Sequence, residues 1–162
     1  MFKKLFNKSK ETHFYAPVNG KIVSLEDVPD PVFSQKMMGE GIAIIPSEGK
    51  VVAPVNGEII QVAPTKHAIG ILAEDGSEIL IHFGLETVAL NGEGFDVHVN
   101  PGDQVKVGQP LMDVRLNVIQ EKAKDTITPI VITNGNQINK QYDFTEPKEG
   151  KAGETLIFSS RD

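Results

Sequence analysis

A duplicated segment constrains the fold of this chain more than any other feature of its sequence. The segment APVNGKIVSL at residues 16–25 recurs as APVNGEIIQV at residues 53–62. In each copy an Asn-Gly pair, which favours a tight turn because both residues tolerate positive φ, leads into a run of alternating apolar residues. Similar segments at a fixed offset are typical of a fold with two related structural units. The repeat therefore predicts a duplicated β-structure.

The other segments also favour strands over helices. The 15 glycines and 10 prolines among 162 residues imply frequent turns, and 40% hydrophobic residues are enough for one ordinary core. Further strands are predicted at residues 41–46, 127–133 and 154–160, and Pro29 and Pro31 predict a loop between the two repeats. Only residues 116–124 have a helical pattern, with Asn117 as the N-cap. We expect one all-β domain.

Two histidines lie in the stretch HAIGILAEDGSEILIHFGLE, residues 67–86, whose pattern is that of two strands joined by a turn. Asp75 and Gly76 are the residue pair typical of a two-residue hairpin turn, which Glu74 and Ser77 would then flank. Because the turn determines which residues of the two strands face each other, it sets the register of the whole hairpin.

The predicted register brings the two histidines together. Ile69 would lie opposite His82, and His67 opposite Gly84. Side chains alternate between the two faces of a strand. The shared face would therefore carry His67, Ile69, Ile71, Leu80, His82 and Gly84. His67 is then the diagonal neighbour of His82, roughly 7–8 Å away at the backbone, so the hairpin predicts a histidine pair on one sheet face.

Charge and composition disfavour several functional classes. The net charge of −6 disfavours nucleic acid, whose recognition needs a basic surface, and favours basic protein partners. The chain has no cysteine, which rules out disulfides and thiolate chemistry and is usual for proteins of the cytoplasm. No apolar run approaches the roughly 20 residues of a membrane-spanning helix, and no signal peptide is recognisable. We expect a cytoplasmic protein.

The N-terminal segment MFKKLFNKSK combines four lysines with large apolar residues. We predict a flexible basic tail over residues 1–14, followed by one domain over residues 15–162. A weak peripheral membrane contact through residues 1–10 is the alternative, because a short basic and apolar segment becomes helical only when it binds anionic lipid. Met1 favours a free-standing protein over a segment cut from a larger one.

Several strings of the sequence resemble one protein family. They are PVNGKIVSLEDVPDPVFSQKMMGEGIAIIP, VVAPVNGEI, TKHAIGI, EILIHFGLETVALNGEGF and EKAKDTITPIVIT. From about residue 15 to its C-terminus the chain is similar to the glucose-type enzyme IIA domain of the bacterial phosphoenolpyruvate:sugar phosphotransferase system. The resemblance implies an antiparallel β-sandwich or barrel built from a duplicated hybrid motif, with one or two short helices. It also implies a phosphotransferase that works through a phosphohistidine intermediate without a cofactor.

The resemblance further implies roles for four residues. His82, in the string HFG, would accept the phosphoryl group, and His67 would stabilise that group by a hydrogen bond. Thr65 matches a threonine of the family, two residues before the supporting histidine, and would orient the His67 ring. The attacking atom would be Nε2 of His82, while its Nδ1 proton is donated to the backbone carbonyl of Gly84. A neutral imidazole is a suitable nucleophile near pH 7.

The implied partners are the histidine-containing phosphocarrier protein, which donates the phosphoryl group, and the IIB domain of a glucose-type sugar permease, which accepts it. Regulatory protein targets are a further expectation. An acidic rim of Asp30 and Glu86 around an apolar patch would steer a basic carrier protein to the histidine. The patch would consist of Val32, Phe33 and Leu80, with Phe33 as the clearest surface aromatic residue.

Two other functions fit parts of the pattern. A zinc-dependent hydrolase of similar β-sandwich fold would use clustered histidines, but the segment around His98 offers Asp96 and Asn100 instead of a complete ligand set. We predict no dedicated metal site, although His67 and His82 together would be able to catch zinc opportunistically. A biotinyl- or lipoyl-like carrier module would need a lysine at the tip of an Asn-Gly turn, and neither turn has one.

Overall fold

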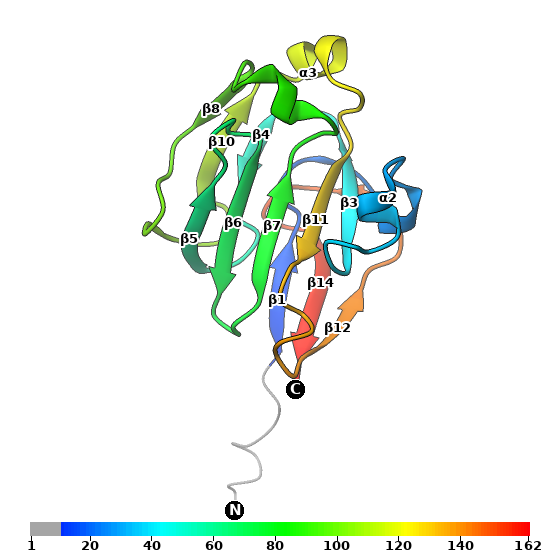
Figure 1. The fold of residues 1–162 in the computed structure, drawn as a ribbon. Helices are drawn as coiled ribbons and strands as arrows, with labels where there is room; N and C mark the ends of the chain where they lie inside the picture. The colour runs from blue at the N-terminus through cyan, green and yellow to red at the C-terminus, as the bar shows by residue number, and fades with distance from the viewer. Residues whose placement is uncertain (1–10) are drawn as a thin grey trace, which may run out of the picture.

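The computed structural model describes residues 11–162, so the predicted membrane contact of residues 1–10 lies outside the described residues. Within them, three antiparallel sheets form the fold (Figure 1). The largest has the strand order β13-β2-β3-β11-β7-β6-β5-β9, and the small ones have the orders β4-β10-β8 and β1-β14-β12. The large sheet consists of β2 (Gly20–Ser24), β3 (Gly41–Pro46), β5 (Gly57–Val62), β6 (Ala68–Ala73), β7 (Glu78–His82), β9 (Gln104–Val105), β11 (Thr128–Ile132) and β13 (Lys148–Gly150). The small sheets consist of β4 (Lys50–Val52), β8 (Phe95–Val97) and β10 (Pro110–Val114), and of β1 (Thr12–Tyr15), β12 (Gln141–Phe144) and β14 (Leu156–Arg161).

The small sheets pack against one face of the large sheet and enclose the main core (Figure 1). Every second side chain of a strand reaches this core, as expected for packed antiparallel sheets. Its fully buried members include Ile22, Ile69 and Ile81 from the large sheet and Phe14, Leu111 and Phe158 from the small sheets. The predicted antiparallel β-sandwich is confirmed.

The duplicated segment is a structural repeat. Each copy continues as a strand, β2 or β5, that pairs antiparallel with the next strand, β3 or β6. The Asn-Gly pairs do not close hairpins, because the strands before them, β1 and β4, belong to the small sheets. The residue before each copy is hydrogen-bonded to the other copy: the amide of Tyr15 donates to the carbonyl of Pro54 and that of Val52 to the carbonyl of Pro17, both over 2.8 Å. Each Asn-Gly pair therefore marks where the chain passes from a small sheet to the large one.

The loop between β6 and β7 differs from the predicted two-residue turn. Residues 74–76 form a three-residue loop, closed by a 2.8 Å hydrogen bond from the amide of Ala73 to the carbonyl of Ser77. Asp75 accepts hydrogen bonds from the amide and the hydroxyl of Ser77, at 2.8 and 2.9 Å. Gly76 has φ +94°, the conformation that glycine provides at the end of such loops.

The extra loop residue shifts the hairpin register by one position. Ala68, rather than Ile69, lies opposite His82, and Ile69 lies opposite Ile81. The prediction that Ile69 and Ile71 share the face of His82 is therefore wrong. Both isoleucines are fully buried on the core face of the large sheet. A shift of one residue moves every side chain of a strand to the other face.

The segment between the repeats, predicted to be a loop, contains two short helices. They are the 3₁₀ helix η1 (Leu25–Asp27) and the α-helix α2 (Pro31–Ser34). Pro31 occupies the first turn, where its missing N–H has no helical partner to lose, and the Asp30 carboxylate caps the helix by accepting a 3.0 Å hydrogen bond from the amide of Val32. This segment covers the outer face of the large sheet and buries a second apolar cluster there.

Two further boundaries also need correction. The helix α3 spans Leu116–Lys122, close to prediction, but Arg115 and not Asn117 is its N-cap residue, and no side chain caps it. The 3₁₀ helix η2 (Thr87–Leu90) follows the second histidine.

The tail was predicted to extend to residue 14, whereas β1 begins at Thr12 and pairs with β14. In residues 11–162 no helix is long and apolar enough to cross a membrane.

Candidate functional site

The rings of His67 and His82 lie in contact, with centroids 4.7 Å apart and planes at 76°. His82 is the last residue of β7, and His67 immediately precedes β6. Strand alternation in the observed register would put His67 on the core face, but His67 lies outside the regular strand. Lys66 before it has φ +65°, which turns the chain, while the His67 carbonyl still accepts a 2.8 Å hydrogen bond from the amide of Phe83. The histidine pair thus forms in spite of the wrong register prediction.

A backbone carbonyl holds the ring of His82. Its Nδ1 lies 2.8 Å from the carbonyl oxygen of Gly84. Since a carbonyl only accepts hydrogen bonds, Nδ1 carries the proton and Nε2 keeps its lone pair. Gly84 has φ +78°, and a Cβ there would lie 2.8 Å from Cγ2 of Thr87 and 2.9 Å from the carbonyl oxygen of Asp125. The site therefore requires glycine at this position.

His67 has a partner of its own. Its Nδ1 lies 2.7 Å from the hydroxyl oxygen of Thr65, two residues earlier. When the hydroxyl donates to Nδ1, the ring proton is on Nε2, and His67 can then donate it to a group placed between the two rings. Only 8% of the surface of residue His67 is exposed, and His82 is half-buried.

Both imidazoles are neutral at pH 7. The pKa of His67 is lowered to about 4, first by burial and second by the neighbouring His82, against a hydrogen bond with the backbone of Thr65. Burial also lowers the pKa of His82, and the Gly84 carbonyl and the Asp30 carboxylate partly oppose this. A neutral His82 with a free Nε2 is a competent nucleophile.

We expect the free energy of unfolding to fall as the pH decreases from about 6.5 to about 4. His67 protonates near its ordinary pKa of 6.5 in the unfolded chain but only near 4 in the folded protein. Between these values the unfolded state binds more protons, so acid favours it. Urea unfolding should show a loss of about 1.5 kcal/mol between pH 6.5 and pH 5 that is smaller in His67→Gln. Equal losses in both proteins would contradict the lowered pKa.

Phe33 is not the surface aromatic residue that was predicted. It is only 5% exposed and belongs to the second apolar cluster, under α2. Its ring centroid lies 5.1 Å from that of His82, with planes at 57°. The partner-binding prediction required an exposed side chain, whereas α2 turns Phe33 inward against the sheet. Phe33 therefore supports the His82 ring from beneath the surface.

The other residues predicted to bind partners are accessible to different degrees. Val32 is 39% exposed, and Glu86 is also exposed. Leu80 is half-buried, points to the same side of β7 as His82, and packs against the second apolar cluster. Asp30 is half-buried at the N-terminus of α2. Charge and apolar surface thus both lie close to the histidine pair.

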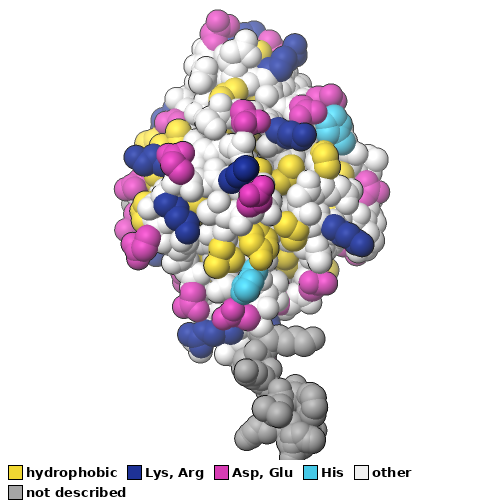
Figure 2. All heavy atoms as spheres, turned by 180° about the vertical axis from the view of Figure 1, so that it is seen from behind, with side chains coloured by type: hydrophobic (Ala, Val, Ile, Leu, Met, Phe, Trp, Pro, Cys, Tyr) yellow, Lys and Arg dark blue, Asp and Glu magenta, His cyan; other side chains and the backbone are white. Residues whose placement is uncertain are grey.

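The sequence prediction missed several exposed apolar side chains. Met37 is 70% exposed and Val88 56%. A surface depression at the histidine pair is lined by Met38, Ile60 and Leu80 together with both rings. Exposed apolar patches often mark binding surfaces, and methionine adapts easily to a partner. The face seen in Figure 2 intermixes Lys or Arg side chains with acidic ones, shows no large patch of one charge, and also exposes a group of hydrophobic side chains.

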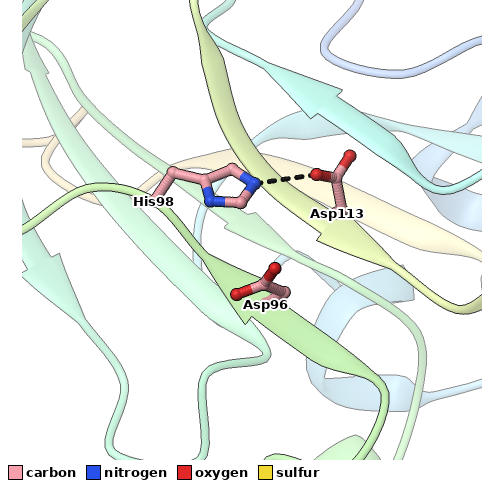
Figure 3. A group of neighbouring side chains, drawn as sticks. All are labelled: Asp96, His98 and Asp113. Atoms are coloured by element: carbon pink, nitrogen blue, oxygen red, sulfur yellow. Dashed lines mark hydrogen bonds and ion pairs between the residues drawn. The ribbon is translucent and has the colours of Figure 1, made fainter.

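A third histidine lies in a separate cluster on the β8–β10 sheet (Figure 3). Nε2 of His98 is 2.8 Å from Oδ2 of Asp113, and Asp96 is the residue opposite Asp113 in the strand pair. Among residues 11–162 this is the only group of three His, Cys, Asp or Glu side chains whose potential metal-ligating atoms all lie within 4.8 Å of one another. All three side chains are exposed. His67 and His82 thus have no third protein ligand of this kind in the described chain. The hydrogen bond from His98 relieves the repulsion between two facing carboxylates, which explains the cluster without a metal.

Comparisons with known proteins agree with the geometry. A model of the family described as phosphoenolpyruvate-dependent sugar phosphotransferase system, EIIA 1, matches residues 12–138. The PTS system glucose-specific EIIA component of Halalkalibacterium halodurans is 53% identical over 167 residues, which cover 97% of this chain and 96% of the relative. The component of that name from Staphylococcus aureus strain COL is 55% identical over 141 residues, 85% of each chain.

The fold has a solved counterpart. The structure of glucose permease IIA from Mycoplasma capricolum superimposes with a TM-score of 0.83 at 37% identity, covering 94% of this chain and 97% of the other. The predicted family and the predicted part in phosphoryl transfer are thereby confirmed, whereas the zinc hydrolase and the biotinyl- or lipoyl-like module gain no support. This chain belongs to the EIIA 1 family of the phosphoenolpyruvate-dependent sugar phosphotransferase system.

Proposed function

We propose that His82 accepts a phosphoryl group from the histidine-containing phosphocarrier protein and passes it to the IIB domain of a glucose-type sugar permease. The protein would then act as a phosphotransferase with a phosphohistidine intermediate. One observation carries this proposal: the 2.8 Å hydrogen bond from Nδ1 of His82 to the Gly84 carbonyl, which leaves Nε2 free to attack. The glucose-specific names of the relatives support the choice of sugar.

The chemistry is an in-line displacement on phosphorus. The lone pair of His82 Nε2 forms a new N–P bond while the N–P bond of the donor breaks, and the donor nitrogen keeps that electron pair. The His82 ring gains positive charge as the bond forms. The Gly84 carbonyl faces the Nδ1–H of this ring and stabilises the charge, because a carbonyl oxygen is the negative end of a dipole. In the second transfer the same bond breaks, and the ring returns to its neutral form.

His67 would hold the phosphoryl group after it arrives. The ring is neutral before transfer, since its pKa is about 4. If Thr65 donates to Nδ1, Nε2–H of His67 is available to a phosphoryl oxygen on His82, whose ring lies 4.7 Å away between centroids. A hydrogen bond to such an anion contributes roughly 1.5–3 kcal/mol. That is enough to orient the group and still permit its release.

The surface around the pair suits a partner that is basic and partly apolar. The carboxylates of Asp30 and Glu86 would attract its positive charges, and the exposed atoms of Val32 and Leu80 would provide apolar contact. Phe33 would act from below, by fixing the His82 ring. Regulatory proteins that bind only the phosphorylated or only the unphosphorylated form are a further proposed class of partner. The proposed location of the protein is the cytoplasm.

Incubation with phosphoenolpyruvate, enzyme I and the phosphocarrier protein tests the function. We expect one phosphoryl group per chain, stable to base and labile to acid, because the bond formed is a phosphoramidate. Purified IIB domains of permeases for glucose and for other sugars are then added in parallel, and the domain that removes the label is the acceptor. Absence of label with an active carrier would refute the transfer role. Removal of the label only by a IIB domain for another sugar would refute the glucose assignment.

A further inference from the structure

We propose that Thr87 is a positioning residue for phosphoryl transfer, because its hydroxyl group fixes the backbone turn whose Gly84 carbonyl selects the reactive tautomer of His82. This inference rests on the proposed role of His82. The Thr87 side chain makes no hydrogen bond to His67 or His82. It would act on His82 only through the backbone of residues 83–84.

The turn after β7 is tied down on both sides of Phe83. The hydroxyl of Thr87 donates a 2.9 Å hydrogen bond to the carbonyl of Phe83, and both residues are fully buried. The amide of Phe83 donates to the carbonyl of His67 over 2.8 Å. Phe83 therefore links the two histidine segments, and Thr87 supplies the bond that fixes its carbonyl end.

The next peptide group points the Gly84 carbonyl at His82. The amide of Leu85 donates a 2.9 Å hydrogen bond to the backbone carbonyl of Asp125. In a planar trans peptide the C=O and N–H bonds point in opposite directions, so the Gly84 oxygen faces away from Asp125 and towards the Nδ1 of His82. Thr87 also packs close to this peptide, since its Cγ2 lies 2.8 Å from the position that a Cβ on Gly84 would take.

Within residues 11–162, no other side chain caps the far end of this turn, where η2 begins. Glu86 precedes η2 in a left-handed conformation with φ +59° and makes no side-chain capping bond. Without the Thr87 hydroxyl the buried Phe83 carbonyl would lose its side-chain donor, and the turn would gain by moving to find another. A displaced Gly84 carbonyl would no longer favour the proton on Nδ1. The His82 tautomer with its proton on Nε2, which has no lone pair on Nε2 for attack on phosphorus, would then become populated.

Two variants of Thr87 are compared. Thr87→Val removes the hydroxyl group and keeps the shape of the side chain, whereas Thr87→Ser keeps the hydroxyl group. Thr128→Val is the matched control, because Thr128 is equally buried and its hydroxyl donates to a carbonyl, that of Thr126, at 3.0 Å. Nitrogen-15 NMR of the unphosphorylated protein reports the tautomer of His82. Steady-state transfer from the phosphocarrier protein reports kcat and KM.

We expect Thr87→Val to populate the Nε2–H tautomer and to lower kcat about 10–100-fold, the range typical for loss of a hydrogen-bond partner that orients a metal-bound histidine. The KM for the carrier should not change. Thr87→Ser and Thr128→Val should keep the wild-type tautomer and rate. A wild-type tautomer and rate in Thr87→Val would overturn the inference. Failure of the wild-type protein to accept phosphate would instead refute the proposed function, even if the tautomer responds as expected.

Discussion

The His82→Ala variant should accept no phosphoryl group from the phosphorylated carrier, whereas the wild-type protein accepts one per chain. Alanine has no lone pair to attack phosphorus, and removal of the nucleophile costs an enzyme such as subtilisin about 10⁶-fold in rate. His67 is no substitute, because its Nδ1 is engaged by Thr65 and its pKa of about 4 makes it a poor nucleophile. Incorporation of radioactive phosphate, followed by acid and base treatment, measures the effect.

His98→Ala is the matched control for this variant. His98 lies on another sheet, is hydrogen-bonded to Asp113 and is exposed, so its removal should leave labelling at the wild-type level. Circular dichroism must first establish that both variants fold and melt as expected. Normal labelling of a folded His82→Ala would contradict the assignment of the nucleophile. Loss of label in His98→Ala as well would mean that the assay responds to general damage.

The histidine pair was predicted from the sequence, but the hairpin register from which it was derived was wrong. The pair Asp75-Gly76 favours a two-residue turn when only neighbours in sequence are considered. In the folded protein the Asp75 carboxylate also accepts a hydrogen bond from the hydroxyl of Ser160, and the hydroxyl of Ser77 lies 2.6 Å from that of Tyr142. These partners come from β12 and β14, far along the chain. They favour the three-residue loop, and a local pattern has no access to them.

Burial near the site was harder to predict than chemical identity. Pro29 and Pro31 predicted a loop, although an aspartate directly before a proline, as in Asp30-Pro31, is also a helix start signal. The direction of Phe33 depends on α2 and on the apolar side chains of Leu85 and Ile127, which come from distant segments. The strand at Gly41–Pro46, by contrast, was predicted at its correct bounds, because a buried apolar run between glycine and proline needs no distant information.

The His67→Ala variant should still accept the phosphoryl group but should pass it to the IIB domain roughly 10–150-fold more slowly. The range corresponds to the loss of one hydrogen bond to a charged group, about 1.5–3 kcal/mol. During acceptance the donor protein holds the phosphoryl group in line with Nε2 of His82. During donation only this protein presents the group, so an unheld phosphoryl group on His82 seldom has the in-line geometry. Rapid-quench measurement of both half-reactions with labelled protein separates the two effects.

The Thr65→Val variant tests the same argument one bond further away. Thr65 contacts Nδ1 of His67 and is not placed against the phosphoryl group, so its loss should slow donation less than the loss of His67 does. The effects of the two substitutions on the activation free energy of donation should not add in the double variant, because both act through the His67 ring. If His67→Ala slows acceptance as strongly as donation, His67 contributes to both transition states equally and not to presentation of the phosphoryl group. If neither step changes, the 4.7 Å contact between the rings has no part in transfer.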